Sequence, residues 1–486
     1  MSKQIADLKP GELWKHFHSL TQIPRPSKEE GQIIEFMKKF GEGLGLETIV
    51  DEVGNVIIKK PATPGFENRK GVVLQGHLDM VPQKNSDKDH DFSKDPIDAY
   101  VDGEWVTANG TTLGADNGIG VAATMAVLAS KELKHGLVEG LFTIDEETGM
   151  TGAFGLKPGL LDGDILINLD SEDEGELYVG CAGGTNANIQ FTYKEEQVPA
   201  GHVALKLVIS GLKGGHSGID IPLYRANSNK LLNRFLWYGI KNHGMRIAMI
   251  DGGSLRNAIP RESFAVVTIP ESEKAGVMDW VKKMEAIFKS EYASIEPDLK
   301  FSAEVTDLPS TVIDKESATA VVNGVYATPN NVIRMSNDME GLVETSTNLA
   351  VVKSHEGVVD ILCLLRSSVD TAMVDLKNTF TAALEPLGAK VVFDGEYPGW
   401  KPNLDSPILK TMQEVYNNKY GKIPEIKAIH AGLECGLLGD VYPNWDMISF
   451  GPTIRFPHSP DEKVNIETVG KFWDYLVETL ENIPEK

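Results

Sequence analysis

Residues 71–82 of the chain read Gly-Val-Val-Leu-Gln-Gly-His-Leu-Asp-Met-Val-Pro. The run around Val72–Leu74 is short, apolar and β-branched, which predicts a buried strand of a parallel sheet. The run ends in His77 and Asp79, whose side chains point to the same side because side chains alternate along a strand. A carboxylate beside a histidine is typical of a metal-binding imidazole. On its own, however, a His-x-Asp pattern is more often a polar strand end, so the remaining sequence has to distinguish the two interpretations.

Two further apolar runs also end in acidic residues. Leu141–Ile144 leads directly into three acids, Asp145–Glu147, and Asp164–Leu169 leads into Asp170. Three consecutive carboxylates repel one another unless a cation compensates their charge. In α/β proteins, ligands bind at the edge of the sheet where the carboxyl ends of the strands meet. We therefore expect these acids to lie close to His77.

A further acid, Asp116, lies in the glycine-rich segment Gly110–Gly120, where a loop enters a predicted helix over Ile119–Leu128. A helix N-cap would by itself account for this aspartate. The segment is not a phosphate-binding loop, because it lacks the GxxxxGK[ST] pattern. Much later in the chain, His458 lies in a loop over Pro457–Glu462.

Together these residues form a set of nitrogen and oxygen donors: His77, Asp116, Glu146 or Glu147, Asp170 and His458. Such a set, without thiolates, suits zinc, cobalt or manganese. One carboxylate shared by two ions about 3.5–4 Å apart would form a co-catalytic hydrolase site. The adjacent glutamates allow one of them to bind metal while the other serves as general base.

The composition excludes several classes of protein. The formal net charge is −23, which argues against nucleic acid and anionic membranes as partners because both require clustered Lys and Arg. No apolar stretch approaches the roughly 18 residues of a membrane span, and the N-terminal segment lacks the apolar core of a signal peptide. The three cysteines, Cys181, Cys363 and Cys435, form neither a metal-finger nor a disulfide pattern. We therefore expect a cytoplasmic protein with reduced thiols.

At 486 residues the chain exceeds what one hydrophobic core usually serves, which predicts two domains. The α/β pattern of the first part gives way to alternating strands and helices over residues 187–398 and returns at Gly399. We expect a discontinuous α/β catalytic domain, residues 1–186 and 399–486, with a mainly parallel central sheet. Strand and helix order recurs within the insert, which predicts an α+β domain of two related subdomains.

The N-terminal region is predicted to be helical. Residues 11–22 form one expected helix, and the apolar spacing of residues 33–40 predicts a second helix that ends in the glycine-rich Gly41–Gly45. Ser27 and Glu30 match a capping box, in which Ser27 caps the second helix and Glu30 reaches back to it.

Long motifs along the whole chain resemble those of the dinuclear-zinc peptidases and deacylases related to glutamate carboxypeptidase, carnosinase and aminoacylase. The motifs read GHLDMVPQKN, GTTLGADNGIG, CAGG, LKGGHSG, RNAIPRE, HAGLECG and GPTIRFPHSPDE. The resemblance implies a zinc-exopeptidase-like catalytic domain, a lid formed by the insert, and two divalent ions, zinc first with cobalt or manganese as alternatives. It implies hydrolysis of Xaa-His and other unblocked dipeptides, carnosine-type substrates included, by a metal-bridged water. Residues 146–149 read Glu-Glu-Thr-Gly where the family reads Glu-Glu-Ala-Gly, a departure that leaves both acids intact.

The resemblance also implies a role for each donor. One ion would be held by His77, Asp116 and Asp170, and the other by Asp116, Glu147 and His458. Asp79 would orient His77, and Glu146 would activate the water and pass its proton to the leaving amine. The peptide bond between Asp116 and Asn117 is expected to be cis.

For the insert, the resemblance implies that His216 stabilises the oxyanion and that Asn257 and Arg366 hold the C-terminal end of the substrate. Without the resemblance, His216 would be explained by a glycine-flanked turn and Arg366 by a surface ion pair. Glu434 would bind the free amino terminus of the substrate or only cap a loop near the site. Dimers are common in the family, so the resemblance also implies a homodimer. In some of these dimers a lid residue of one subunit completes the site of the other.

Three alternatives stay open. An N-acyl amino acid deacylase and a tripeptidase would use the same constellation, and a non-catalytic metal- or peptide-binding protein would keep the fold. Loss of Glu146 or of one ligand would indicate the non-catalytic protein, and all of these residues are present. A serine hydrolase has no support, because no G-x-S-x-G motif occurs.

Overall fold

The structure is a computed structural model that describes residues 5–486, so the first four residues of the N-terminal segment lie outside the described part. The chain forms two compact units. The first unit contains the described residues up to Cys181 together with Trp400–Ala428 and Leu433–Lys486, and the second contains Ala182–Gly399 and Ile429–Gly432. The sequence placed residues 429–432 in the first unit. They belong to the second because the carbonyls of residues 429 and 431 both accept the backbone N–H of residue 182.

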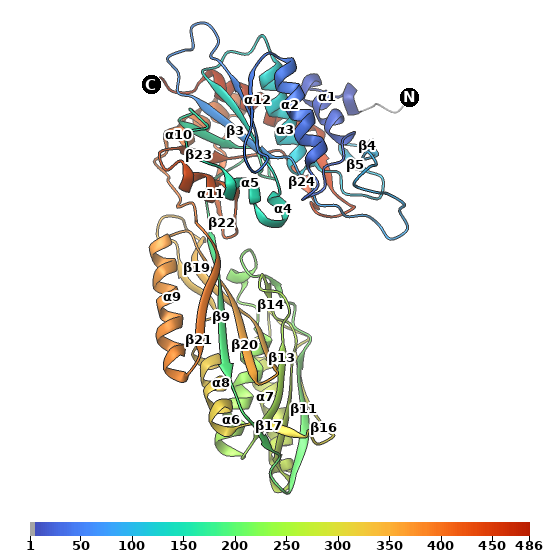
Figure 1. Cartoon of the computed structure of the whole chain (residues 1–486), viewed down its shortest axis with the longest axis vertical. Coiled ribbons are helices and arrows are strands. Elements are labelled where there is room, and N and C mark those ends of the chain that lie inside the picture. Colours follow the sequence, from blue (N-terminus) through green and yellow to red (C-terminus); the bar gives the residue numbers. More distant parts are fainter. Residues whose placement is uncertain (1–4) are drawn as a thin grey trace. The chain divides into compact units, whose positions relative to one another are not determined.

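The first unit is built on an eight-stranded mixed sheet (Figure 1). Its central strands β6, β3, β7 and β23 run parallel, whereas β1, β2 and β8 pair antiparallel. Every residue of β3, β6 and β7 is buried, which explains their continuous apolar runs and confirms the expected, mainly parallel centre. The strands in spatial order are β1 (Glu47–Val50), β2 (Val56–Lys60), β6 (Val138–Thr143), β3 (Val72–His77), β7 (Ile165–Asn168), β23 (Asp446–Ser449), β8 (Glu176–Cys181) and β22 (Glu425–Ile429).

Helices cover this sheet. α3 packs against β3 and β6, α2 packs against β1 and β2, and α10 packs against β23. None of the helices within residues 5–486 is long and apolar enough to cross a membrane. The helices of the first unit are α1 (Gly11–Thr21), α2 (Gly31–Gly43), α3 (Ala115–Ala129), α4 (Glu146–Gly149), α5 (Thr151–Gly155), α10 (Pro407–Tyr420), α11 (Glu434–Val441) and α12 (Ile466–Glu481).

The expected capping box at the start of α2 is wrong. The hydroxyl of Ser27 donates to Oδ2 of Asp79 at 2.8 Å and makes no cap bond, and the residue at the cap position is Glu30. Oε1 of Glu30 accepts the backbone N–H of Lys28 at 2.7 Å and that of Asp145 at 3.2 Å. Both side chains therefore bind loops at the carboxyl edge of the sheet, a tertiary use that local spacing could not reveal.

A small second sheet in the same unit joins two distant loops. Its order is β24 (Ile454–Arg455), β25 (Lys463–Asn465), β5 (Trp105–Ala108) and β4 (Ala99–Asp102). The loop between β24 and β25 contains His458, and the segment that follows β5 leads to Asp116. Because β25 pairs with β5, the two loops start from neighbouring strands although about 340 residues separate them.

The second unit is an antiparallel sheet with helices on one face (Figure 1). Strands such as β11 and β15 alternate buried and partly exposed residues, as expected for a sheet with one covered face. The strands in spatial order are β16 (Lys300–Thr306), β11 (His202–Ser210), β15 (Ser263–Pro270), β13 (Arg246–Gly252), β19 (Val343–His355), β20 (Val358–Ser367), β9 (Gly183–Thr192) and β21 (Lys390–Tyr397), and β18 (Asn331–Met335) pairs with β19. The helices are α6 (Ser228–Asn242), α7 (Lys274–Glu291), α8 (Lys315–Ala327) and α9 (Asp370–Leu384).

The second unit repeats one motif twice, which confirms the expectation of two related subdomains. One half runs β11, α6, β13, β15, α7, β16, and the other runs β9, α8, β19, β20, α9, β21. Both are split βαβ arrangements with the same strand order, and they join edge to edge between β13 and β19. All four helices contribute to one apolar core, with Phe235, Phe288 and Phe380 fully buried.

Candidate active site

The structure brings the predicted metal ligands of the first unit together at the carboxyl edge of its sheet. His77 is the last residue of β3, and Asp170 follows β7. Nε2 of His77 lies 3.1 Å from Oδ1 of Asp116 and 3.4 Å from Oδ1 of Asp170. Ligands at about 2.0–2.1 Å from a tetrahedral zinc ion lie about 3.3 Å from one another. Both distances from Nε2 of His77 match this spacing, and the three donor atoms all lie within 4.8 Å of one another.

A second group of donors shares Asp116. Nε2 of His458 lies 3.1 Å from Oδ2 of Asp116 and 2.9 Å from Oε2 of Glu147. Each carboxylate oxygen of Asp116 thus faces a different histidine. A carboxylate in this position can bridge two ions, as co-catalytic hydrolase sites require. The peptide bond between Asp116 and Asn117 is cis, as expected.

Charge in this cluster favours cations. Burial disfavours a charged imidazole, but the carboxylates of Asp170, Asp116 and Asp79 raise the pKa of His77 well above its ordinary value. Burial raises the pKa of Asp170 to about 7, and the neighbouring carboxylates add to this shift. The raised pKa values of His77 and Asp170 show that the cluster favours positive charge, which a bound divalent ion would supply in place of protons.

Two buried oxygens in the cluster have no hydrogen-bond partner, Oδ1 of Asp170 and Oε1 of Glu147. An unsatisfied buried carboxylate oxygen costs free energy, so such atoms call for a ligand. Both belong to residues of the donor groups that surround Asp116. The donor set, its spacing and these unpartnered oxygens all fit divalent metal ions.

Asp79 connects the ligand His77 to the acidic pair. Its Oδ1 lies 3.3 Å from Nδ1 of His77 and accepts the backbone N–H of Glu146 at 3.0 Å, and its Oδ2 accepts the N–H of Glu147 at 3.3 Å. Burial opposes ionisation, yet these contacts, led by His77, lower the pKa of Asp79 to about 2. The ionised carboxylate of Asp79 therefore lies between the imidazole of His77 and the backbone of the acidic pair.

Glu146 lies beside the donor groups in α4, a single turn that follows Asp145 in the left-handed region. Its carboxylate comes within 4.8 Å of ligand atoms of His77 and Glu147. Burial raises the pKa of Glu146 well above its ordinary value, and the negative charge of Asp170 contributes. Glu146 thus borders the predicted ion positions while its neighbour Glu147 takes part in the group with His458.

Glu434, at the start of α11, is almost fully buried. Its Oε2 accepts hydrogen bonds from Nε2 of Gln75 at 2.6 Å and from the hydroxyl of Thr143 at 2.8 Å. Its Oε1 is buried without a partner. One oxygen is therefore committed to the sheet, and the other is left for a further donor.

A buried polar layer lies one step behind the ligands in the sheet. Gln75 and Asn168 precede His77 and Asp170 by two residues, so they share the same side of their strands. Nδ2 of Asn168 donates to Oε1 of Gln75 at 2.5 Å, and Oδ1 of Asn168 accepts the hydroxyl of Ser449 at 2.5 Å and the backbone N–H of Asp170 at 3.2 Å. Sequence reasoning missed this layer, although two amides within apolar strands were the available signal.

The second unit contains the remaining predicted residues. Nδ1 of His216, on β12 (Gly215–His216), accepts the N–H groups of Gly218 and Ile219 at 3.2 and 3.1 Å, which leaves the proton on Nε2. Arg366, on β20, is buried, donates to the hydroxyl of Tyr397 at 3.2 Å, and has an unpartnered Nε. Burial first, and then the charge of Arg366, lower the pKa of His216.

The side chain of Asn257 is exposed, and only its backbone contacts the segment around His216. Its carbonyl accepts the N–H of Ser217 at 2.8 Å, next to the pairing of His216 with Ala258. Asn257 directly precedes β14 (Ala258–Ile259), which pairs with β12, so the backbone of Asn257 lies beside His216.

His430 is a buried histidine of the second unit that sequence reasoning did not select. Its Nε2 lies 2.7 Å from the hydroxyl of Ser346. Burial, followed by the positive charge of Arg366, lowers the pKa of His430 to about 3, so it is neutral near pH 7. Arg366 and the two histidines His216 and His430 therefore form one local group of hydrogen-bonding nitrogens.

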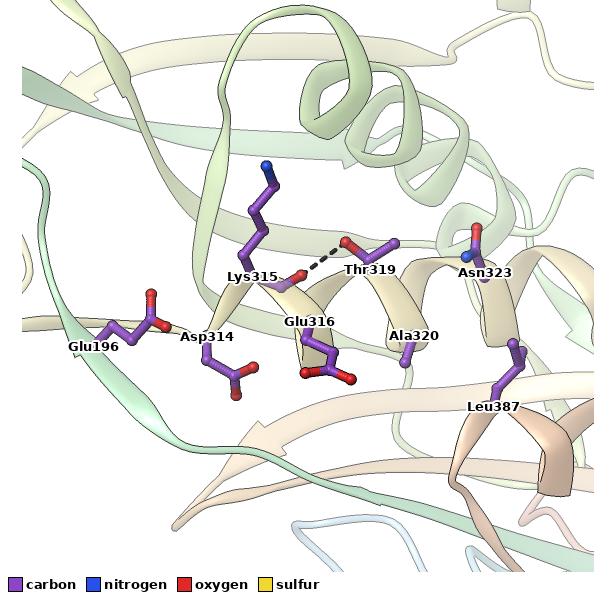
Figure 2. A pocket seen from close by; sticks show the side chains of 8 residues that line it. All are labelled: Glu196, Asp314, Lys315, Glu316, Thr319, Ala320, Asn323 and Leu387. Carbon is purple, nitrogen blue, oxygen red and sulfur yellow. Dashed lines mark hydrogen bonds between the residues drawn. The ribbon is translucent and has the colours of Figure 1, made fainter.

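A separate hollow of about 600 Å³ lies on the second unit and is drawn in Figure 2. Its lining combines acidic, amide and apolar side chains with one lysine, and none of the lining residues is a histidine or a cysteine. The hydroxyl of Thr319 donates to the carbonyl of Lys315 at 2.7 Å, which is an ordinary bond within a helix (Figure 2). The chemistry of the hollow does not match that of the donor groups, and we assign it no role.

Comparison with known proteins agrees with this geometry. The chain is 46% identical to the cytosol non-specific dipeptidase of Escherichia coli (strain K12) over 483 aligned residues. The alignment covers 99% of this chain and 100% of the relative. It matches the crystal structure of aminoacylhistidine dipeptidase from Vibrio alginolyticus with a TM-score of 0.95 and 50% identity, over 100% of this chain and 99% of that one. A tripeptidase from Staphylococcus aureus, with a TM-score of 0.56, 16% identity and coverage of 98% and 99%, shares the fold alone.

These similarities confirm the resemblance that the sequence motifs indicated. A family model described as peptidase family M20/M25/M40 matches residues 73–482, which is most of the chain and includes every predicted ligand. The chain therefore belongs to peptidase family M20/M25/M40.

Proposed function

We propose that this protein is a metal-dependent dipeptidase that hydrolyses Xaa-His and other unblocked dipeptides, carnosine-type substrates included. One observation carries the proposal: the two oxygens of Asp116 each lie 3.1 Å from a different histidine, His77 or His458. This is the arrangement of a carboxylate shared by two ions. The relatives that match over almost the whole chain are themselves named as dipeptidases, which supports the same substrate class here.

We propose that the protein binds two metal ions. Zinc is the first candidate, and cobalt and manganese are the alternatives. Imidazole and carboxylate donors without thiolates suit all three. His77, Asp116 and Asp170 would hold one ion, and Asp116, Glu147 and His458 the other. When bound, such ions polarise a carbonyl oxygen and lower the pKa of water.

The residues around the ions would carry the proton transfers. Glu146 has no ligand role in this assignment, and we propose that it takes the proton of the attacking water and delivers it to the leaving amine. Asp79 would keep His77 in the tautomer and orientation that leave Nε2 free for metal, because its Oδ1 lies 3.3 Å from Nδ1. Its bonds to the N–H groups of the acidic pair would fix Glu146 relative to that imidazole.

Further residues would recognise the substrate. The unpartnered, buried Nε of Arg366 supports a bidentate contact with the C-terminal carboxylate of a dipeptide, with Asn257 beside it. The proton on Nε2 of His216 suits a donor to the developing oxyanion. We propose that Oε1 of Glu434, buried and without a partner, accepts the free amino terminus.

We also propose that the protein is cytoplasmic and that it forms a homodimer. The name of the Escherichia coli relative places that relative in the cytosol, and dimers are common among the peptidases that the motifs resemble. Sedimentation would give about twice the 53.1 kDa of the chain for a dimer.

The test is hydrolysis of β-alanyl-histidine and several plain dipeptides by the purified protein, before and after chelation and with zinc, cobalt or manganese added back. N-acetyl amino acids and tripeptides belong in the same panel. We expect chelation to abolish dipeptide cleavage and metal to restore it. Bound metal with cleavage of N-acetyl amino acids or tripeptides alone would replace the proposal by a deacylase or tripeptidase. Bound metal with no cleavage of any substrate would indicate a binding protein.

A further inference from the structure

One buried carboxylate binds four consecutive backbone N–H groups beside the predicted metal ligands. The carboxylate belongs to Glu462, whose side chain is 2% exposed. Its Oε2 accepts from Leu113 at 2.8 Å and Gly114 at 3.0 Å, and its Oε1 accepts from Ala115 at 2.7 Å and Asp116 at 3.2 Å. A carboxylate offers about four lone-pair sites, so these bonds use its full capacity.

Arg25 holds the same turn from its carbonyl side. Its guanidinium donates to the carbonyl of Gly114 and, at 3.0 Å each, to the carbonyls of Leu78 and Asp79. Gly114 has a φ of +71°, and a Cβ there would lie 2.4 Å from Nη2 of Arg25. Glycine suits this turn, which is held between the buried carboxyl group of Glu462 and the buried guanidinium of Arg25.

The turn ends at Asp116, the ligand that both donor groups share. Glu462 also lies in the loop that contains His458, four residues after that histidine. The bonds of Glu462 to the turn therefore fix the backbone of Asp116 relative to the loop of His458. Glu462 makes no such bond to His77, which ends β3, or to Asp170, which follows β7.

We propose that Glu462 is a positioning residue that sets the distance between Asp116 and His458, and so the affinity of the site formed by Asp116, Glu147 and His458. The inference rests on the proposed function, because it assumes two ions. Groups that orient metal ligands typically contribute 10–100-fold to metal affinity. The structure assigns this orienting role to Glu462, although Glu462 is not itself a metal ligand in either donor group.

The experiment compares Glu462→Gln with a matched control, Glu139→Gln. Glu139 is equally buried in the same unit, accepts the backbone N–H groups of Asp162 and Gly163, and lies near the opposite end of β6 from the ligands. A glutamine offers one acceptor oxygen, and its amide would face two N–H donors in place of the other. Metal-free proteins are titrated with Zn²⁺ by calorimetry and with Co²⁺ by visible absorbance.

We expect Glu462→Gln to weaken binding of one of two equivalents by about 10–100-fold, with an altered Co²⁺ spectrum, and to weaken the other equivalent less, because Asp116 is shared by both groups. The control should lose thermal stability but bind both equivalents as the wild type does. If Glu462→Gln fails to fold, Glu462→Asp keeps the charge with a shorter reach and undergoes the same titrations.

Wild-type affinity for both equivalents in the Glu462 variant would overturn this inference while leaving the proposed function intact. Equal weakening of both equivalents in the variant and in the control would also overturn it, since that result indicates a general structural role. If the wild-type protein bound fewer than two ions, the proposed function would fail, and this inference with it.

Discussion

Oδ1 of Asp79 accepts the backbone N–H of Glu146 at 3.0 Å, and the same oxygen lies 3.3 Å from Nδ1 of His77. A single buried carboxylate thus links a predicted metal ligand to the predicted general base. Ser27 completes the arrangement, because its hydroxyl donates to Oδ2 of Asp79 at 2.8 Å. Positions of the imidazole and of the acidic pair are therefore coupled, and a change at Asp79 should affect both.

Replacing Asp79 by asparagine tests this coupling. The amide keeps one acceptor oxygen but places an NH₂ group against the N–H of Glu147 or of Glu146, and it removes the charge beside His77. We expect metal affinity to fall about 10–100-fold and kcat to fall as well. Calorimetry with Zn²⁺ and steady-state kinetics at saturating metal measure the two effects separately.

Ser27→Ala is the control for this variant, since it removes one hydrogen bond to the same carboxylate. It should cost about 1 kcal/mol of stability and leave metal binding nearly unchanged. Wild-type kinetics and metal affinity in Asp79→Asn would show that His77 and Glu146 keep their positions without this carboxylate.

Glu146→Gln should keep both ions and lose nearly all turnover. Glu146 is a ligand in neither group that we assign, and a positioned general base contributes about 10²–10⁴-fold to the rate. We expect kcat to fall by at least this factor while the stoichiometry of metal and the KM stay near their wild-type values. Elemental analysis of the purified variant gives the metal content, and hydrolysis of a Xaa-His dipeptide gives kcat.

The matched control is Thr148→Ala, two residues away in the same turn. The hydroxyl of Thr148 donates to Asp145, so this change leaves the carboxylates of Glu146 and Glu147 in place. It should retain most of the activity. Turnover in Glu146→Gln close to that of the control would disprove the assigned role of this glutamate.

Asn168→Leu tests the buried polar layer. The substitution removes the partner of Gln75, of Ser449 and of the backbone N–H of Asp170. Each unsatisfied buried group costs about 1–3 kcal/mol, so the free energy of unfolding should fall by about 3 kcal/mol or more. Thermal unfolding of the metal-free protein measures this loss, and calorimetry should show weaker binding at the site of Asp170.

Ile167→Val on the same strand provides the comparison for Asn168→Leu. Ile167 is fully buried and apolar, so its truncation should cost about 0.5–1.5 kcal/mol without any change in metal binding. A smaller loss of stability in Asn168→Leu than in Ile167→Val would mean that the polar layer is satisfied in another way.

His430 predicts a pH dependence of stability. Its pKa falls from 6.5 to about 3 on folding, mainly through burial, so between these values the unfolded chain binds the extra proton. The stability that depends on a neutral His430 is therefore fully present above pH 6.5. It decreases by about 1.4 kcal/mol per pH unit as the pH falls from 6.5 toward 3. His430→Gln removes the titrating group and should show a smaller loss of stability.

Unfolding of the wild type and of His430→Gln is compared at pH 7.5 and pH 5.5, because both proteins share every other titrating group. We expect the wild type to lose more stability than the variant over this interval. Equal losses would show that His430 takes up its proton in the folded protein.

Much of the fold was predictable because its elements are local patterns. The helix expected over residues 11–22 is α1, the apolar spacing of residues 33–40 lies within α2, and the helix expected over Ile119–Leu128 lies within α3. The capping box at Ser27 failed because the hydroxyl has a stronger partner in Asp79, far away in the sequence. Residues 429–432 were placed with the other unit because their partner, Ala182, is still farther away, about 250 residues earlier in the chain.

The sequence by itself determined the residue types of the site and the strand ends that carry them, since alternation and strand polarity are local properties. His77 and Asp170 were predicted at one edge for this reason. Only the tertiary structure decided that the carboxylate of Asp116 lies between His77 and His458, and that Glu462 and Arg25 fix its turn from opposite sides. These contacts join segments up to about 350 residues apart, and their geometry follows from packing of the sheets, which spacing along the chain does not encode.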